Sequence, residues 1–170
     1  MNDLLNKLSS YNLFNFLLPG VISAYLIDAI TPYRLLPTDF VIGAFVSYFI
    51  GMIISRVGSL IVEPLLKHLG VAKFANYPDY IEASKNDEKI VLFSEVNNTY
   101  RTILAMFVFL LIVKLYSLLE SQLLWLVSWR WLIALILGII LFVASYRKQV
   151  GYIKQRVDHF INSTSNSKKD

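Results

Sequence analysis

Four long apolar stretches constrain the fold of this chain more than any other feature of its sequence. They cover about residues 12–30, 40–60, 102–119 and 125–146. A bilayer's hydrocarbon core of about 30 Å requires roughly 20 helical residues to cross it. The stretches also lack the periods of 2.0 or 3.6 that mark half-buried elements of soluble proteins. The sequence therefore predicts an all-α polytopic membrane protein with four transmembrane helices.

Composition supports this class. The chain has 170 residues, of which 56% are hydrophobic and only 16% are charged, unlike an ordinary soluble domain. It contains no cysteine, which excludes disulfides, thiolate metal sites and cysteine nucleophiles. We expect one membrane domain over residues 1–146, followed by a basic tail over residues 147–170.

The connection between the second and third spans, residues 61–101, carries most of the charge outside the tail and is the only candidate for a soluble segment. Pro64 is expected to break or bend the second helix, and Gly70 reads as a helix end. Tyr77–Pro78 reads as the start of a short helix, because proline favours the first helical position. Asn86 or Asp87 could then cap a helix that continues into the third span.

The placement of lysine and arginine predicts the orientation, because cytoplasmic loops retain positive charge. Arg34 is the one such residue expected on the outer side, and the tryptophans Trp125, Trp129 and Trp131 fall near the same interface. Both termini and residues 61–101 are therefore expected in the cytoplasm, and the compact size suits a bacterial inner membrane. The twelve basic residues assigned to that side are Lys7, Lys67, Lys73, Lys85, Lys89, Arg101, Arg147, Lys148, Lys154, Arg156, Lys168 and Lys169.

Small residues recur at every fourth position of the second span, at Gly43, Ser47, Gly51, Ser55 and Ser59. Helices in lipid associate through close backbone approach, which small side chains four residues apart permit. The stripe therefore predicts a helix-packing spine. The stripe packs either against another helix of the same chain or against a second copy of the protein, in a homo-oligomeric seam or a pore lining. Within the chain, the first span is the natural partner, because Gly20 and Ala24 form a similar pair of small residues.

Four charged residues fall within or close to the predicted spans. Arg56 and Glu63 are about 20° apart around a helix and can share a face. They either extend toward the cytoplasmic surface or form a buried ionic lock or ion path. Asp28 and Lys114 lie in the outer halves of their spans, either as a pair between helices or as two independent interfacial charges.

The sequence contains no recognisable catalytic or cofactor motif. His68 and His159 are solitary, without the companions of a metal site, and the glycine-rich nucleotide motifs and the serine-hydrolase motif are missing. We therefore expect a protein without enzymatic activity, cofactor or metal. The basic tail is expected to meet the headgroups of the lipid bilayer rather than nucleic acid.

The stretches YNLFNFLLPGVISAYL, SYFIGMIISRVGSLIVEP and SEVNNTYRT resemble a group of small uncharacterised four-helix bacterial inner-membrane proteins. In overall plan the chain is similar to the four-helix membrane components of antiphage defence modules such as Kiwa or transmembrane cyclic-oligonucleotide systems. The first resemblance covers most of the chain, and the second is architectural. Together they imply a membrane component that works alone or within a defence module.

Three functions follow. The first is a non-catalytic membrane effector or sensor that forms a homo-oligomer through the stripe and docks a cytoplasmic protein. The second is a narrow ion channel or transporter lined by the four charges, and the third is a membrane-embedded enzyme. We favour the first, because the outer connections are too short to form a site. Candidate docking residues are the aromatics of the longer segment, Phe74, Tyr77, Tyr80 and Phe93.

Overall fold

The computed structural model describes residues 13–166, and every regular element in this range is a helix. This confirms the all-α prediction for the described residues. Lys7, Lys168 and Lys169, which contribute to the predicted orientation, lie outside them. In chain order the elements are η1 (Leu13–Leu17), α2 (Leu18–Ile30), α3 (Phe40–Val57), η2 (Gly58–Val62), α4 (Glu63–His68), α5 (Tyr77–Asn86), α6 (Glu88–Gln122) and α7 (Trp125–Asn166).

Three continuous helical stretches are long and apolar enough to cross a membrane: Phe40–His68, Glu88–Gln122 and Trp125–Asn162. They indicate a membrane protein, as the composition predicts. The first predicted span corresponds to the shorter apolar helix Asn15–Ile30. Four transmembrane crossings therefore stay a prediction, whereas residues 13–166 contain three helices of sufficient length.

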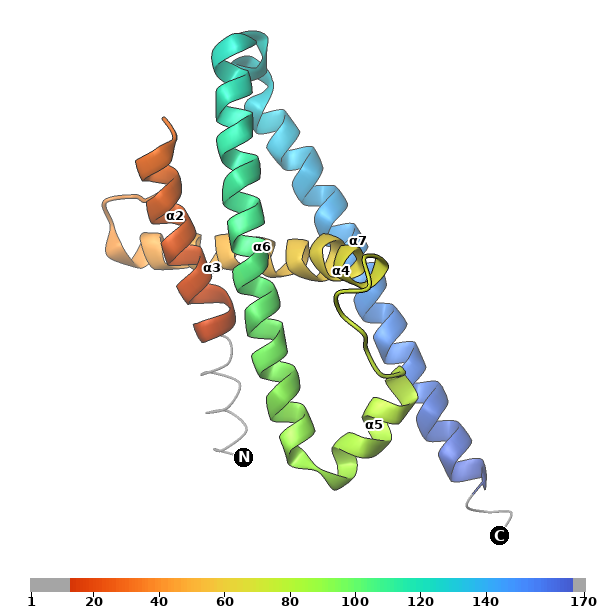
Figure 1. The fold of residues 1–170 in the computed structure, drawn as a ribbon. Helices are drawn as coiled ribbons and strands as arrows, with labels where there is room; N and C mark the ends of the chain where they lie inside the picture. Colours follow the sequence, from red (N-terminus) through yellow and green to blue (C-terminus); the bar gives the residue numbers. More distant parts are fainter. Residues whose placement is uncertain (1–12, 167–170) are drawn as a thin grey trace.

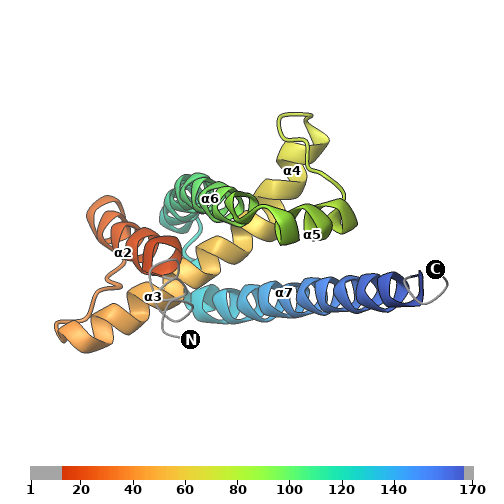
Figure 2. The same cartoon turned by 90° about the horizontal axis from the view of Figure 1, so that it is seen from below.

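The long helices do not all lie side by side. Figure 1 shows that α2 and α6 begin toward one end of the molecule and that α7 ends there, while the turn between α6 and α7 lies at the other end. The continuous helix formed by α3, η2 and α4 runs crosswise to α6 in Figure 1, and Figure 2 shows the same relation from below. Gly58 lies where η2 meets α6, and a Cβ atom added there would be 3.1 Å from Cβ of Ala105.

The apolar core lies where α2, α3, η2 and α6 meet. Its buried residues come from these four elements and are Ala24, Ile27, Ile50, Ile54, Val62, Ala105, Met106 and Leu110. In contrast, only 6% of the most apolar window of α7 is buried within the chain. Most of the α7 surface therefore needs lipid, or another protein, to cover it.

Two π-helical turns interrupt the α-helical geometry, and each ends two residues before a proline. η1 ends at Leu17 before Pro19, and η2 ends at Val62 before Pro64. A proline inside a helix donates no backbone hydrogen bond and its ring clashes with the carbonyl four residues earlier, which the wider turn relieves. Of the two outcomes predicted at Pro64, a break is wrong, because the helix continues through this residue to His68.

The end of α4 and the starts of α5 and α6 lie at the positions that local chemistry predicts. α4 is followed by Gly70, whose φ of 71° lies in the left-handed region that glycine tolerates. α5 starts at Tyr77 with Pro78 in its first turn. Of the two candidate caps for α6, Asp87 is the observed one, and its side chain accepts a hydrogen bond from the backbone N–H of Lys89 at 2.9 Å.

Candidate functional site

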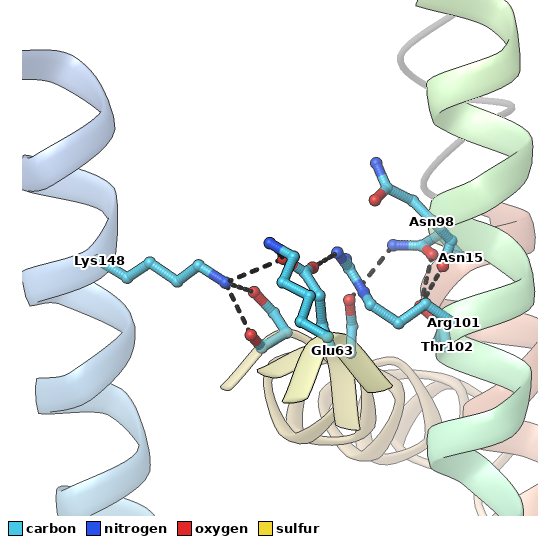
Figure 3. A network of polar contacts seen from close by, with 9 residues as sticks. Asn15, Glu63, Asn98, Arg101, Thr102 and Lys148 are labelled. Atoms are coloured by element: carbon cyan, nitrogen blue, oxygen red, sulfur yellow. Dashed lines mark hydrogen bonds and ion pairs between the residues drawn. The ribbon is translucent and has the colours of Figure 1, made fainter. Parts of the chain in front are cut away.

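A buried carboxylate, Glu63, joins three helices through ion pairs. It lies at the start of α4 and is only 7% exposed. One oxygen, Oε2, is 2.6 Å from Nη1 of Arg101 on α6, and Oε1 is 2.9 Å from Nζ of Lys67 one turn along its own helix. Nζ of Lys148 on α7 lies 3.9 Å from Oε1. We refer to Glu63, Lys67, Arg101 and Lys148 as the Glu63 cluster (Figure 3).

Lys148 also satisfies a backbone group that Pro64 leaves without a partner. In η2 the N–H of Glu63 bonds to the carbonyl of Gly58, and the next residue, Pro64, has no N–H to offer to Ser59. Lys148 donates instead, at 2.7 Å to the Ser59 carbonyl oxygen and at 2.8 Å to its Oγ. Pro64 thus leaves the Ser59 carbonyl oxygen to accept the hydrogen bond from Lys148, which attaches α7 to η2.

A second polar group, buried beside the cluster, joins η1, α3 and α6. The Thr102 hydroxyl lies within hydrogen-bond distance of both Oδ1 of Asn15, at 2.8 Å, and the carbonyl of Asn98, at 2.9 Å. The Asn15 amide donates to Oγ of Ser55 at 3.4 Å. Asn15 and Thr102 are almost fully buried, so these bonds replace water at the centre of the fold (Figure 3).

A small cavity of about 20 Å³ adjoins the Glu63 cluster on the α7 side. This volume accommodates about one water-sized group. Six of the seven residues that line it carry polar side chains: Arg56, Ser59, Ser145, Lys148, Gln149 and Tyr152.

The opposite end of the molecule holds a separate polar cluster. Tyr33 donates to Oε2 of the buried Glu120 at 2.8 Å, and Nε of Arg130 forms an ion pair with Oε1 at 3.0 Å without the alignment of a hydrogen bond. The Arg130 guanidinium also lies 5.1 Å from the centre of the Tyr33 ring. Burial and the hydrogen bond to Glu120 raise the pKa of Tyr33 to about 12, so that the phenol remains a donor.

The small-residue stripe divides into three parts. Ser47, Gly51 and Ser55 are buried against η1 and α2. A Cβ added at Gly51 would overlap the carbonyl oxygen of Phe16, and one at Gly20 would overlap that of Ser47. The remaining two positions face elsewhere, since Gly43 adjoins Pro37 and Ser59 accepts from Lys148. The centre of the stripe thus contacts the same chain, and a seam between copies stays a prediction.

The four candidate intramembrane charges separate into two groups. Glu63 pairs with Lys67, Arg101 and Lys148, and no ion pair joins it to Arg56 within residues 13–166. At the other end of α2, Lys114 donates to the Ile30 carbonyl at 2.6 Å, and Asp28 accepts from the backbone of Leu35 at 2.8 Å. Asp28 and Lys114 therefore support the same turn without pairing with each other.

The four docking candidates also differ in their surroundings. Phe74 is 48% exposed, with the Lys67 ammonium 4.2 Å from its ring centre, and Phe93 is 66% exposed. Tyr77 packs within the chain, because its ring centre lies 6.5 Å from that of Tyr80 and 5.6 Å from that of Tyr152 on α7. Phe74 and Phe93 are the more accessible pair.

Sequence reasoning did not identify the partners of the buried acids. The sequence assigns Arg101 to the positive charge of the cytoplasmic side and Lys148 to the basic tail, and it predicts no role for Asn15 or Glu120. The available signal was polarity inside or beside apolar stretches, at Asn15, Thr102 and Glu120. Such residues in membrane helices usually face protein rather than lipid.

Over the described residues, the fold and its two ion-paired clusters define a helical membrane protein whose helices are joined by ion pairs as well as by close backbone packing. Comparisons of the chain with protein-family models, with curated proteins and with solved structures found no match.

Proposed function

We propose that this protein is a non-catalytic membrane effector or sensor that docks a protein partner through residues 61–101. One observation carries the proposal: the short helix of this segment is physically connected to the Glu63 cluster. Tyr77 of α5 contacts Tyr152 of α7, and Nζ of Lys148 lies 5.8 Å from the centre of the same Tyr152 ring. A partner that displaces α5 would therefore act on the lysine that holds α7.

The accessible aromatics of this segment supply the docking surface in the proposal. Phe74 touches Lys67, which belongs to the Glu63 cluster, and Phe93 lies near the start of α6. Exposed aromatic side chains are favoured at protein interfaces because they bury large areas at little entropic cost. We place the docking surface in the cytoplasm and the protein in a bacterial inner membrane, on the basis of the charge distribution.

We further propose that the protein self-associates, on the basis of the poorly covered α7 rather than of the centre of the stripe. Membership in an antiphage defence module is part of the same proposal and rests on the architectural similarity alone. An ion path receives less support, because Asp28 and Lys114 bond to the turn after α2, far along α6 from Arg101 and Glu63.

Photo-crosslinking tests the docking surface. A photoreactive phenylalanine analogue at position 93 should crosslink one defined soluble protein in cells, because this side chain faces outward near the start of α6. The matched control is position 107 of the same helix, where Phe107 is 58% exposed within an apolar stretch and should crosslink lipid or membrane protein. Phe74→Ala should reduce the product at position 93 by about tenfold if both side chains bind one partner. Equal products at positions 93 and 107 would contradict the proposal.

Reporter fusions test the orientation. A reporter active only in the cytoplasm should be active at either terminus, because most lysines and arginines fall before the first apolar stretch, between the second and the third, or after the fourth. Insertion of the same reporter at the turn after Gln122 should be inactive. Activity at the turn, or loss at either end of a correctly inserted protein, would overturn the proposed topology.

A further inference from the structure

The cavity beside the Glu63 cluster is surrounded by more positive charge than the chain neutralises. Glu63 is the single carboxylate that the cluster contains. It faces Lys67, Arg101 and Lys148, and a fourth cation, Arg56, lines the cavity next to Lys148. Four positive groups thus gather around one negative group at the surface between η2 and α7.

Arg56 is the cation without a counter-charge. No hydrogen bond or ion pair joins its side chain to another residue in the range 13–166. Its charge instead repels that of Lys148. Since Arg56 is half-buried at the edge of an apolar helix, an unpaired guanidinium there is unfavourable unless an anion binds.

The donors around the cavity fit a tetrahedral oxyanion. A guanidinium can bind two oxygens of a phosphate at once, and an ammonium adds a third contact. Lys148 supplies the ammonium among the lining residues, and Gln149 and Tyr152 also line the cavity. The volume of about 20 Å³ accepts about one oxygen atom of the phosphate but not a sugar or a base, so the rest of the ligand must remain outside.

We infer that Arg56 and Lys148 bind the phosphate group of an anionic ligand at this cavity. The phosphate belongs either to an anionic phospholipid beside α7 or to a free phosphate compound from the aqueous side. In both cases the negative charge compensates the surplus around Glu63 and stabilises the contact between η2 and α7. The inference requires no protein partner, although the cavity shares Lys148 and Tyr152 with the contacts that connect α5 to the Glu63 cluster.

Thermal unfolding of the full chain in a phosphate-free maltoside detergent tests this site. Two probes distinguish the sources of the phosphate: phosphatidylglycerol for the lipid, and inorganic phosphate for the free ion. The midpoint of unfolding should rise with at least one probe, and Arg56→Gln should weaken the apparent affinity by about tenfold or more. Arg56→Lys should restore part of the effect. The matched control is Arg147→Gln, which removes one positive charge from the exposed neighbour of Lys148.

The ligand-free proteins supply a second readout that separates binding from folding. Because Arg56 pairs with no residue in the range 13–166 and repels Lys148, Arg56→Gln should leave the midpoint unchanged or raise it when neither probe is present. If Arg56 had a purely structural role, Arg56→Gln would lower the midpoint of unfolding in the absence of both probes. A response to phosphatidylglycerol alone assigns the site to lipid, and a response to inorganic phosphate assigns it to a free phosphate compound. Equal responses of the Arg56→Gln and Arg147→Gln proteins, or no response of the unaltered chain to either probe, would overturn the inference.

Discussion

Replacing Glu63 by glutamine should destabilise the protein by about 3 kcal/mol, because the change leaves Arg101 and Lys148 facing each other across a neutral amide. Removing one member of a buried ion pair costs more than the pair contributes, since the remaining charges have lost their water without compensation. The free energy of unfolding, measured by steric trapping or by denaturation in mixed micelles, reports this loss. α7 should also become more accessible to protease near Lys148.

The matched control is Glu82→Gln on α5. Glu82 forms an ion pair of 3.0 Å with Lys85, but both side chains are more than half exposed. Surface pairs of this kind contribute little to stability, because water and salt screen the two charges. Similar stabilities of the Glu63→Gln and Glu82→Gln proteins would show that the Glu63 cluster does not hold the helices together.

Replacing Gly51 by alanine should destabilise the protein by about 3 kcal/mol, even though alanine is the better helix former. The added methyl group would overlap the backbone carbonyl of Phe16, and backbone cannot rotate out of the way as a flexible side chain can. The helices would have to separate, and the Asn15–Ser55 hydrogen bond nearby would lengthen. Unfolding measurements in detergent detect the change.

Gly138→Ala provides the comparison, because it makes the same substitution inside α7, where the new methyl group would meet no other part of the chain within 4 Å beyond its own helix backbone and chain neighbours. This variant should be as stable as the original chain or more stable by up to about 1 kcal/mol, through helix propensity alone. If the Gly51→Ala protein behaves like the Gly138→Ala protein, then α3 and η1 do not approach as closely as the structure shows.

Local chemistry accounts for the features that the sequence predicts well. Gly70 ends a helix because of its left-handed φ, and Asp87 begins one because its carboxylate accepts a backbone hydrogen bond. Long apolar stretches likewise predict helices that suit a bilayer. Each of these inferences depends on residues within one or two turns of each other.

The crosswise course of α3 and the composition of the Glu63 cluster could not be predicted in this way. Lipid and protein neighbours are both apolar, so an apolar stretch does not reveal the direction in which its helix crosses another. Glu63 and Arg101 are 38 positions apart, and Asn15 and Thr102 are 87 apart. Their pairing depends on which faces of η1, α4 and α6 meet, which no local pattern encodes. The π turn before Pro64 also changes which residues share a helical face on either side of it, and the sequence pattern does not predict this turn.

The length of α7 gives its attachment at Lys148 a mechanical consequence. With a rise of about 1.5 Å per residue, the helix extends roughly 35 Å on the Trp125 side of Lys148 and roughly 27 Å on the other. Lys148 is then the fulcrum of a lever, and the contact of α5 with Tyr152 acts about 6 Å from it. A displacement of α5 by a fraction of an ångström would therefore become a movement several times larger at the Asn166 end of α7, whereas the Arg130–Glu120 ion pair holds the Trp125 end.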